Sequence, residues 1–155
     1  TIGLRYFNVF GRRQDPDSVY AAVIPKFVKQ MINNQSPTIN GDGNYSRDFT
    51  YIDNVIQMNV LSILTNDEKS LNEVYNTACG DRNSLLDLFG YLKKHLGKID
   101  TKILNVEPVF GPYRQGDIPH SLASIEKAKK LLGYNPKYNL EMGIKEAIKW
   151  YYKNL

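Results

Sequence analysis

Residues 39–55, which read INGDGNYSRDFTYIDNV, constrain the fold of this chain more than any other stretch. Gly41 and Gly43 flank Asp42, and an Asp-Gly pair is a hairpin turn signal because glycine tolerates positive φ. Strand-type residues follow the turn, namely Phe49, Tyr51 and Ile52. The pattern predicts two strands joined by a tight turn.

A helix is expected directly after this hairpin. Asp53 is a good N-cap residue. Apolar side chains then recur at helical spacing, at Ile56, Val60, Ile63 and Leu64. The whole stretch therefore predicts strand, turn, strand and helix.

The second expected strand carries a charged pair, Arg47-Asp48. Such a pair beside a turn is either an ion pair on a solvated strand edge or an anion site whose carboxylate orients the arginine. The spacing alone leaves both interpretations open.

Composition excludes several classes of protein. The chain has 155 residues, 42% of them hydrophobic and 23% charged, as expected for one globular domain. It has no apolar run of about 18 residues, which a transmembrane helix would need. The single cysteine, Cys79, excludes an internal disulfide framework and a cysteine-cluster zinc site, and it fits a reducing, cytoplasmic setting.

The first residues suggest that the sequence comes from the interior of a longer protein. Thr1 opens the chain without an initiator methionine, and an apolar, strand-like run follows at once.

Periodicity and turn residues place the other elements. Helices are expected over residues 22–33, 53–65, 85–96, 124–133 and 140–152, strands over 2–7, 74–78 and 102–106, and a loop over 108–119. Ser84 is the expected N-cap of the third helix, and Gly97 follows its end. Because helices separate the strands, the predicted fold class is α/β with a partly parallel sheet.

No self-sufficient catalytic site is visible in the sequence. The only histidines are His95 and His120, and we expect His95 to be solvated among lysines. No metal-ligand spacing is present. None of the eleven tyrosines is followed four residues later by a lysine. The glycines of residues 41–46 lead into a strand, unlike those of the dinucleotide fingerprint.

Polar residues in separate loops nevertheless form a set that could bind a diphosphate. Two cations would face its negative charges, and an aspartate would accept a hydrogen bond from a sugar hydroxyl. The helix that begins at Ala22 and Val23 offers free backbone N–H groups. The loop residues are Asn8, Arg47, Arg114 and Asp117.

Five segments together resemble the C-terminal part of the nucleotide-sugar epimerases, which are extended short-chain dehydrogenases/reductases. The segments are RYFNVFG (5–11), AAVIP (21–25), SRDFTYIDNV (46–55), YNTACG (75–80) and RQGDIPHSLAS (114–124). The run GRRQDP (11–16) with YAAVIP (20–25) is narrower and looks most like bacterial UDP-N-acetylglucosamine 4-epimerases.

The resemblance implies a fold in which residues 1–155 form a single substrate-binding domain, with 1–7 a strand of a Rossmann sheet whose N-terminal half is mostly missing. It also implies a role for each matching residue. Tyr6 and Phe7 would lie beside the nicotinamide of NAD, and Asn8, Arg47 and Arg114 would hold the diphosphate of a UDP-sugar. The uracil pocket would be lined by Ala22, Val23 and Asn40. Asp117 would bind a ribose hydroxyl, and the sugar would be contacted by Gln14 and Ser121.

The family's reaction is a transient oxidation at C4 of the sugar, with the tyrosine of a Tyr-x-x-x-Lys pair as the base. That pair and most of the NAD site would lie before Thr1, so we expect this chain alone to be catalytically inactive. The whole protein is expected to be a cytoplasmic homodimer without nucleic-acid or membrane partners.

Two other functions stay open at this stage. The chain could be the substrate domain of a nucleotide-sugar dehydratase, decarboxylase or reductase. A basic nucleic-acid-binding module fits the sequence less well, because the lysines at 93–94 and 127–130 are on separate helices without interleaved aromatics. Those lysines are either solvated helix faces or anion-attracting surfaces.

Overall fold

The computed structural model describes residues 1–17 and 23–155. Its α-helices are α1 (Val23–Ile32), α2 (Ile52–Leu64), α3 (Leu85–Leu96), α4 (Glu126–Leu132) and α5 (Leu140–Asn154), with short 3₁₀ turns η1 (Glu68–Ser70) and η2 (Thr101–Asn105). Its strands are β1 (Ile2–Tyr6), β2 (Val9–Phe10), β3 (Thr38–Asn40), β4 (Ser46–Arg47), β5 (Thr50–Tyr51), β6 (Glu73–Thr77), β7 (Asn83–Ser84) and β8 (Val109–Gly111).

The strands associate in pairs. β1 runs parallel to β6, β2 to β5 and β3 to β8, whereas β4 and β7 are antiparallel. The longest pair is β1–β6, in which Ile2 lies opposite Glu73 and Tyr6 opposite Thr77. The predicted α/β class with partly parallel pairing is therefore confirmed.

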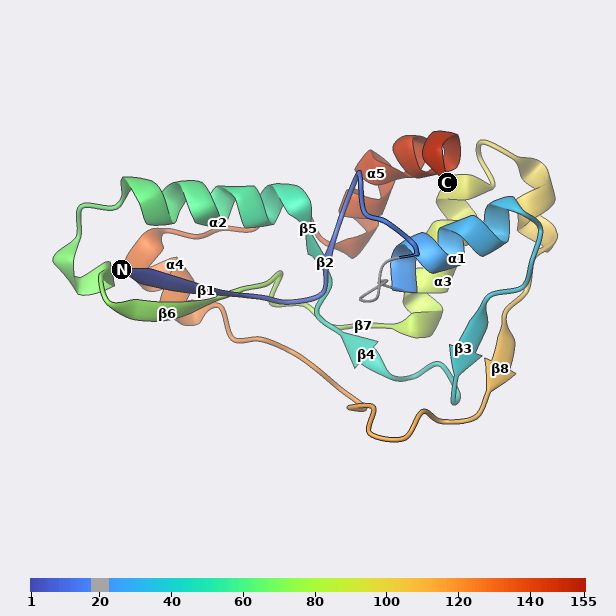
Figure 1. The fold of residues 1–155 in the computed structure, drawn as a ribbon, viewed down its shortest axis with the longest axis horizontal. Coiled ribbons are helices and arrows are strands. Elements are labelled where there is room, and N and C mark those ends of the chain that lie inside the picture. The colour runs from blue at the N-terminus through green and yellow to red at the C-terminus, as the bar shows by residue number, and fades with distance from the viewer. Residues whose placement is uncertain (18–22) are drawn as a thin grey trace.

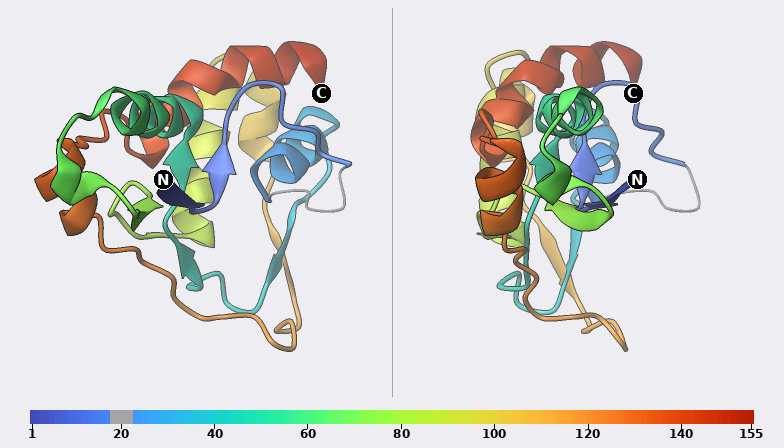
Figure 2. Two further views of the ribbon diagram at one scale, coloured as in Figure 1. Left: turned by 60° about the vertical axis from the view of Figure 1, so that its left-hand side comes forward. Right: turned by 90° about the vertical axis from the view of Figure 1, so that its left-hand side faces the viewer.

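Two groups of elements stand side by side in Figure 1. One holds β1, β6, α2 and α4, and the other holds α1, α3 and α5 with β3 and β8. The long connection from β8 to α4 runs along one side of the molecule from the second group to the first (Figure 2). This connection contains the predicted Arg114–Ser124 motif.

Each group encloses its own apolar cluster. The larger cluster joins the inner faces of α1, α3 and α5, with Phe10 and Tyr51 buried among them. The smaller cluster surrounds Met58, Tyr75 and Tyr134. Burial of these faces supplies the main driving force for folding.

The predicted hairpin at 39–47 is wrong. Gly41 and Gly43 do take positive φ, of 72° and 81°, but the strands on either side of them do not pair with each other. β3 joins β8 and β4 joins β7, both of which come from later in the chain. The glycine turn instead connects two separate strand pairs, and its own backbone bonds to distant residues: the Gly41 N–H donates to the Gly111 carbonyl oxygen at 2.9 Å.

Two further element predictions are corrected. The strand expected at 102–106 is the 3₁₀ turn η2, because the side chain of Asp100 accepts a hydrogen bond from the Lys102 N–H at 2.9 Å and starts a turn. The expected loop at 108–119 contains strand β8.

Helix ends follow the sequence only in part. Ser84 caps α3 in a full capping box with Asp87, as expected. Asp53 is not an N-cap: α2 begins one residue earlier, after Tyr51, and no side chain caps it. The helix expected from residue 124 begins at Glu126, with Ile125 as its N-cap and no capping side chain.

Burial corrects two expectations about helix faces. The spaced residues Ile56, Val60, Ile63 and Leu64 of α2 are exposed, by 46% to 79%, while α2 buries Asn54, Val55 and Met58. His95 is only 7% exposed. It follows Leu92 on the inner stripe of α3, and its Nε2 lies 3.3 Å from Glu141 Oε1.

Candidate functional site

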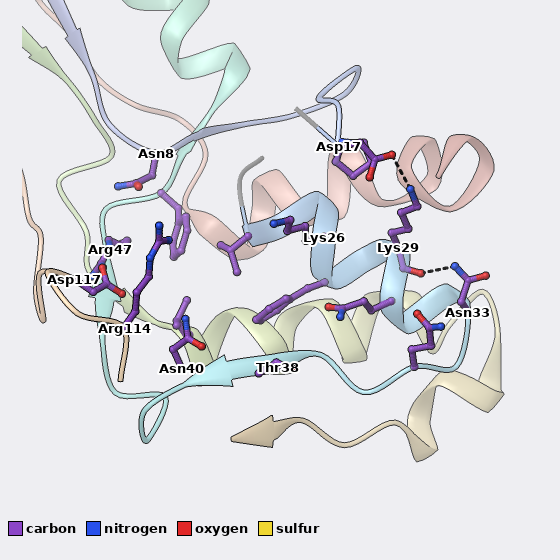
Figure 3. Close-up of a pocket in the computed structure, with 17 residues that line it drawn as sticks. Asn8, Asp17, Lys26, Lys29, Asn33, Thr38, Asn40, Arg47, Arg114 and Asp117 are labelled. Atoms are coloured by element: carbon purple, nitrogen blue, oxygen red, sulfur yellow. Dashed lines mark hydrogen bonds and ion pairs between the residues drawn. The ribbon is translucent and has the colours of Figure 1, made fainter. Parts of the chain in front are cut away.

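A pocket of about 640 Å³ opens between the start of α1, the ends of β3 and β4, and the loop after β8 (Figure 3). Figure 3 shows Asn8, Arg47, Arg114 and Asp117 gathered at one end, with Asn40 close by and the polar side chains of α1 towards the other end. A pocket of this volume accommodates a ligand the size of a nucleotide.

Six of the residues predicted from sequence line this one pocket. They come from separate parts of the chain, and the fold alone brings them together: Asn8, Val23, Asn40, Arg47, Arg114 and Asp117. Ala22, predicted beside Val23, lies outside the described residues.

Arg47 is fixed at the pocket wall by contacts with the loop that follows β8. Its Nη1 donates to the carbonyl oxygens of Ser46 at 2.9 Å and Pro119 at 3.4 Å. Its Nη2 forms an ion pair with Asp117 Oδ1. The side chain is only 19% exposed, so the guanidinium is held in one orientation facing the pocket.

Arg114 and Asp117 belong to a single turn. The Asp117 N–H donates to the Arg114 carbonyl oxygen at 3.2 Å, and Gly116 between them has a φ of 80°. That left-handed conformation suits glycine, which has no Cβ to clash. The turn thus presents a cation and an anion to the same end of the pocket.

Asn8 is held in place by its neighbours at the end of β1. Its φ of 36° lies in a region that asparagine tolerates better than most residues. Its Nδ2 donates to the Asp48 carbonyl oxygen at 3.1 Å, and its own carbonyl oxygen accepts from the Thr50 N–H at 3.2 Å. The amide therefore borders the pocket from a fixed backbone.

Asp48 does not orient Arg47, as one interpretation of the charged pair supposed. The carboxylate is fully buried and accepts hydrogen bonds from the backbone N–H groups of Cys79 at 2.9 Å, Gly80 at 3.0 Å and Ala123 at 3.3 Å. Burial raises the pKa of Asp48, although these three hydrogen bonds oppose the shift. Arg47, the last residue of β4, faces the pocket, whereas the next residue, Asp48, faces the interior.

Apolar side chains form the floor of the pocket beside the arginines. They are Val23, Phe27, Phe49 and Leu85. Such a surface suits the flat face of a base, and the arginines suit phosphates.

Sequence reasoning missed the far rim of the pocket. Polar side chains line it, namely Lys26, Lys29, Gln30, Asn33, Gln35 and Thr38. Lys29 and Gln30 lie three and four residues after Lys26 on α1, which marks one helix face, and Asn33 directly follows the helix. That signal was present in the sequence, but a solvated helix face shows the same pattern.

Four predicted residues do not line this pocket. Gln14 Nε2 donates to the Val9 carbonyl oxygen at 3.0 Å, and the Ser121 N–H donates to the Ser46 carbonyl oxygen at 3.0 Å. Tyr6 is 53% exposed at the end of β1, with its hydroxyl 3.1 Å from Asn59 Oδ1. Phe7 packs against the smaller apolar cluster.

Two features are absent from residues 1–17 and 23–155. No group of three or more His, Cys, Asp or Glu side chains is arranged to hold a metal ion. None of the helices there combines the length and apolar character that crossing a membrane requires.

The strand pairs, the covering helices and the two-arginine pocket define an α/β protein with a site suited to phosphate-bearing ligands. The chain belongs to the NAD dependent epimerase/dehydratase family, whose model matches residues 1–78.

Solved structures share this fold. A UDP-glucose 4-epimerase from Thermotoga maritima, solved with UDP-glucose, is 38% identical with a TM-score of 0.86, and the match covers 98% of this chain and 46% of that one. A UDP-N-acetylglucosamine 4-epimerase from Methanobrevibacter ruminantium, in complex with UDP-N-acetylmuramic acid, is 37% identical with a TM-score of 0.86, covering 99% and 46%.

A curated relative with a different reaction is also similar. The UDP-N-acetyl-alpha-D-glucosaminuronate decarboxylase of Bacillus cytotoxicus is 30% identical over 96% of this chain and 45% of its own length. The chain thus spans about half the length of the relatives that it matches. The resemblance seen in the sequence is confirmed at the level of the family.

Proposed function

We propose that this chain is the UDP-sugar-binding part of an NAD-dependent 4-epimerase acting on UDP-hexoses or UDP-N-acetylhexosamines. The observation that carries the proposal is the meeting of Arg47, Arg114, Asn8 and Asp117 in one pocket with an apolar floor. The similarity to two UDP-sugar epimerases supports the same ligand class. The single cysteine fits work in the cytoplasm.

In this proposal the two arginines and Asn8 bind the diphosphate, and Val23 and Asn40 border the uracil. Asp117 accepts from a ribose hydroxyl. Arg47 is already fixed by its loop contacts, so little side-chain entropy is lost when a phosphate arrives. Gln14 and Ser121 lie outside the pocket. They are proposed to contact the sugar, which would extend past the end of the pocket that holds Arg47 and Arg114.

The residues at the end of β1 fit a nicotinamide. Tyr6 presents an exposed ring at the carboxyl end of a parallel strand, next to Asn8, and ligands of α/β sheets bind at such ends. When bound, NAD would take a hydride from C4 of the sugar and return it to the opposite face. Because no tyrosine here has a lysine four residues later, the base is proposed to lie outside these 155 residues, and this chain alone is proposed to be inactive.

Binding of UDP tests the proposal directly. Isothermal titration of the chain with UDP-N-acetylglucosamine and UDP-glucose should show binding, whereas a DNA oligomer of similar charge should not bind. Arg47→Ala should weaken UDP-sugar binding by about 1.5–3 kcal/mol, the usual loss for a charge-assisted hydrogen bond. Arg5→Ala is the matched control, because Arg5 is exposed on β1 and does not line the pocket. An unchanged affinity in Arg47→Ala would show that Arg47 has a structural role and does not bind the ligand.

A decarboxylase is the second candidate, favoured by the relative from Bacillus cytotoxicus. Its substrate class carries a carboxylate on the sugar. Tighter binding of UDP-glucose than of UDP-glucuronate would argue against the decarboxylase. The opposite order fits a decarboxylase and a UDP-glucuronate 4-epimerase alike, since such epimerases are among the similar structures, and release of CO₂ from UDP-glucuronate by the full-length protein separates the two.

A further inference from the structure

We infer that Asp117 is a specificity residue that makes the site reject inorganic phosphate and pyrophosphate in favour of nucleoside diphosphates. The inference rests on the proposed function and adds a role for the Arg47–Asp117 ion pair. A carboxylate in the wall of an anion site otherwise has an unfavourable effect on every phosphate that enters.

The ion pair and two carbonyl oxygens take up part of the hydrogen-bonding capacity that Arg47 could offer an anion. Arg47 has five N–H donors, and three of them already have acceptors in Ser46, Pro119 and Asp117. An incoming phosphate must therefore share the guanidinium with the Asp117 carboxylate or displace it.

Charge at this end of the pocket is set by three side chains. Arg47 and Arg114 contribute two positive charges, and Asp117 removes one of them. The ionic groups of the other end, Lys26 and the Lys29–Asp17 ion pair at 2.8 Å, lie on and beside α1 (Figure 3). This end of the pocket therefore keeps a single net positive charge, half of what its two arginines supply, before a ligand binds.

Partial burial makes the carboxylate effective. The side chains of Arg47 and Asp117 are 19% and 29% exposed, so their charges are screened less than those of a surface pair. Pyrophosphate has few or no donors at neutral pH and places like charge beside Asp117. A ribose brings hydroxyl donors that the carboxylate can accept, which offsets the repulsion.

The turn places the repulsive charge of Asp117 beside the attractive charge of Arg114. Arg114 and Asp117 are linked by the hydrogen bond from the Asp117 N–H to the Arg114 carbonyl oxygen. A ligand drawn in by Arg114 therefore meets Asp117 as well. Discrimination of this kind works by penalising the wrong ligand rather than by adding contacts to the right one.

The test compares pyrophosphate with UDP in titrations of the 155-residue chain. Asp117→Asn should bind pyrophosphate about tenfold more tightly than the wild type, a gain of about 1.4 kcal/mol. Its preference for UDP over pyrophosphate should fall by more than that factor, because the ribose also loses a charged acceptor. Asp42→Asn is the control: it removes the same charge from the glycine turn, outside the pocket lining, and should leave the preference unchanged.

A carboxylate that merely positions Arg47 gives the opposite result. Asp117→Asn would then bind pyrophosphate equally or more weakly, and the inference would be overturned. If Asp117→Asn does not fold, as judged by circular dichroism, Asp117→Ser gives the same test with a smaller side chain. Failure of the wild type to bind UDP would overturn the proposed function and this inference together. UDP binding with a preference that Asp117→Asn leaves intact would overturn the inference alone.

Discussion

Asp48 connects three segments of backbone through one side chain. The N–H groups of Cys79, Gly80 and Ala123 all point at its carboxylate, although these residues lie 31 to 75 positions away in sequence. The same buried carboxylate, with the Asp81 charge, adds to the effect of burial and raises the pKa of Cys79 to about 11. Cys79 is therefore a protonated thiol at neutral pH, which makes it a poor nucleophile.

Replacing Asp48 by asparagine should lower the free energy of unfolding by about 2–3 kcal/mol. The amide keeps one oxygen acceptor but turns an NH₂ group towards backbone donors, leaving buried N–H groups unpaired. Urea unfolding followed by circular dichroism measures the change. Asp53→Asn, the same substitution at a half-buried site on α2, should cost about 0.5 kcal/mol or less. Equal losses in the two variants would refute a special role for the Asp48 contacts.

At the scale of elements, helix α2 has two unlike faces. Met58 is fully buried in the smaller cluster, whereas Ile63 is 79% exposed on the other side. The apolar stripe that predicted the helix is thus not the stripe that packs. Periodicity identified the helix because both faces carry apolar residues, but it could not say which face would be covered.

Substitutions on the two faces of α2 should have very different effects. Met58→Ala removes buried volume and should cost about 2–5 kcal/mol of stability. Ile63→Glu alters a solvated position and should stay within about 0.5 kcal/mol of the wild type. Chemical unfolding midpoints compare the two variants. A loss in Ile63→Glu as large as that in Met58→Ala would show that the exposed stripe is packed in solution.

At the scale of the whole molecule, Tyr151 links the last helix to the first segment of the chain. Its hydroxyl donates to the Gly11 carbonyl oxygen at 2.9 Å and accepts from the Gly11 N–H at 3.1 Å, across 140 residues. The ring is fully buried in the larger cluster, and burial raises the pKa of Tyr151 well above its ordinary value. This contact holds the 8–17 segment, which includes Asn8 and Gln14, against α5.

Tyr151→Phe should destabilise the protein by about 1–3 kcal/mol, because both polar groups of Gly11 would lose a buried partner. The neighbouring Tyr152→Phe is the control, since Tyr152 is half-buried and its hydroxyl makes no hydrogen bond within the described residues. Thermal unfolding of the two variants gives the comparison. Similar melting temperatures for both would contradict the proposed link.

The sequence by itself determined the features that depend on neighbouring residues. The N-cap at Ser84, the bounds of α3 and the α/β class all follow from local spacing. The resemblance to a family, by contrast, identified Arg47 and Arg114 together as pocket residues. Local signals succeed here because caps and periodic faces act over one or two helical turns.

The tertiary structure decided which distant groups became partners. In the fold, β3 pairs with β8 instead of β4, and His95 is buried. Arg47 forms its ion pair with Asp117, 70 residues away, instead of with the adjacent Asp48. Such choices depend on which surfaces are covered and on where each backbone group finds a hydrogen bond in the finished fold. The spacing of residues along the chain carries no direct record of either.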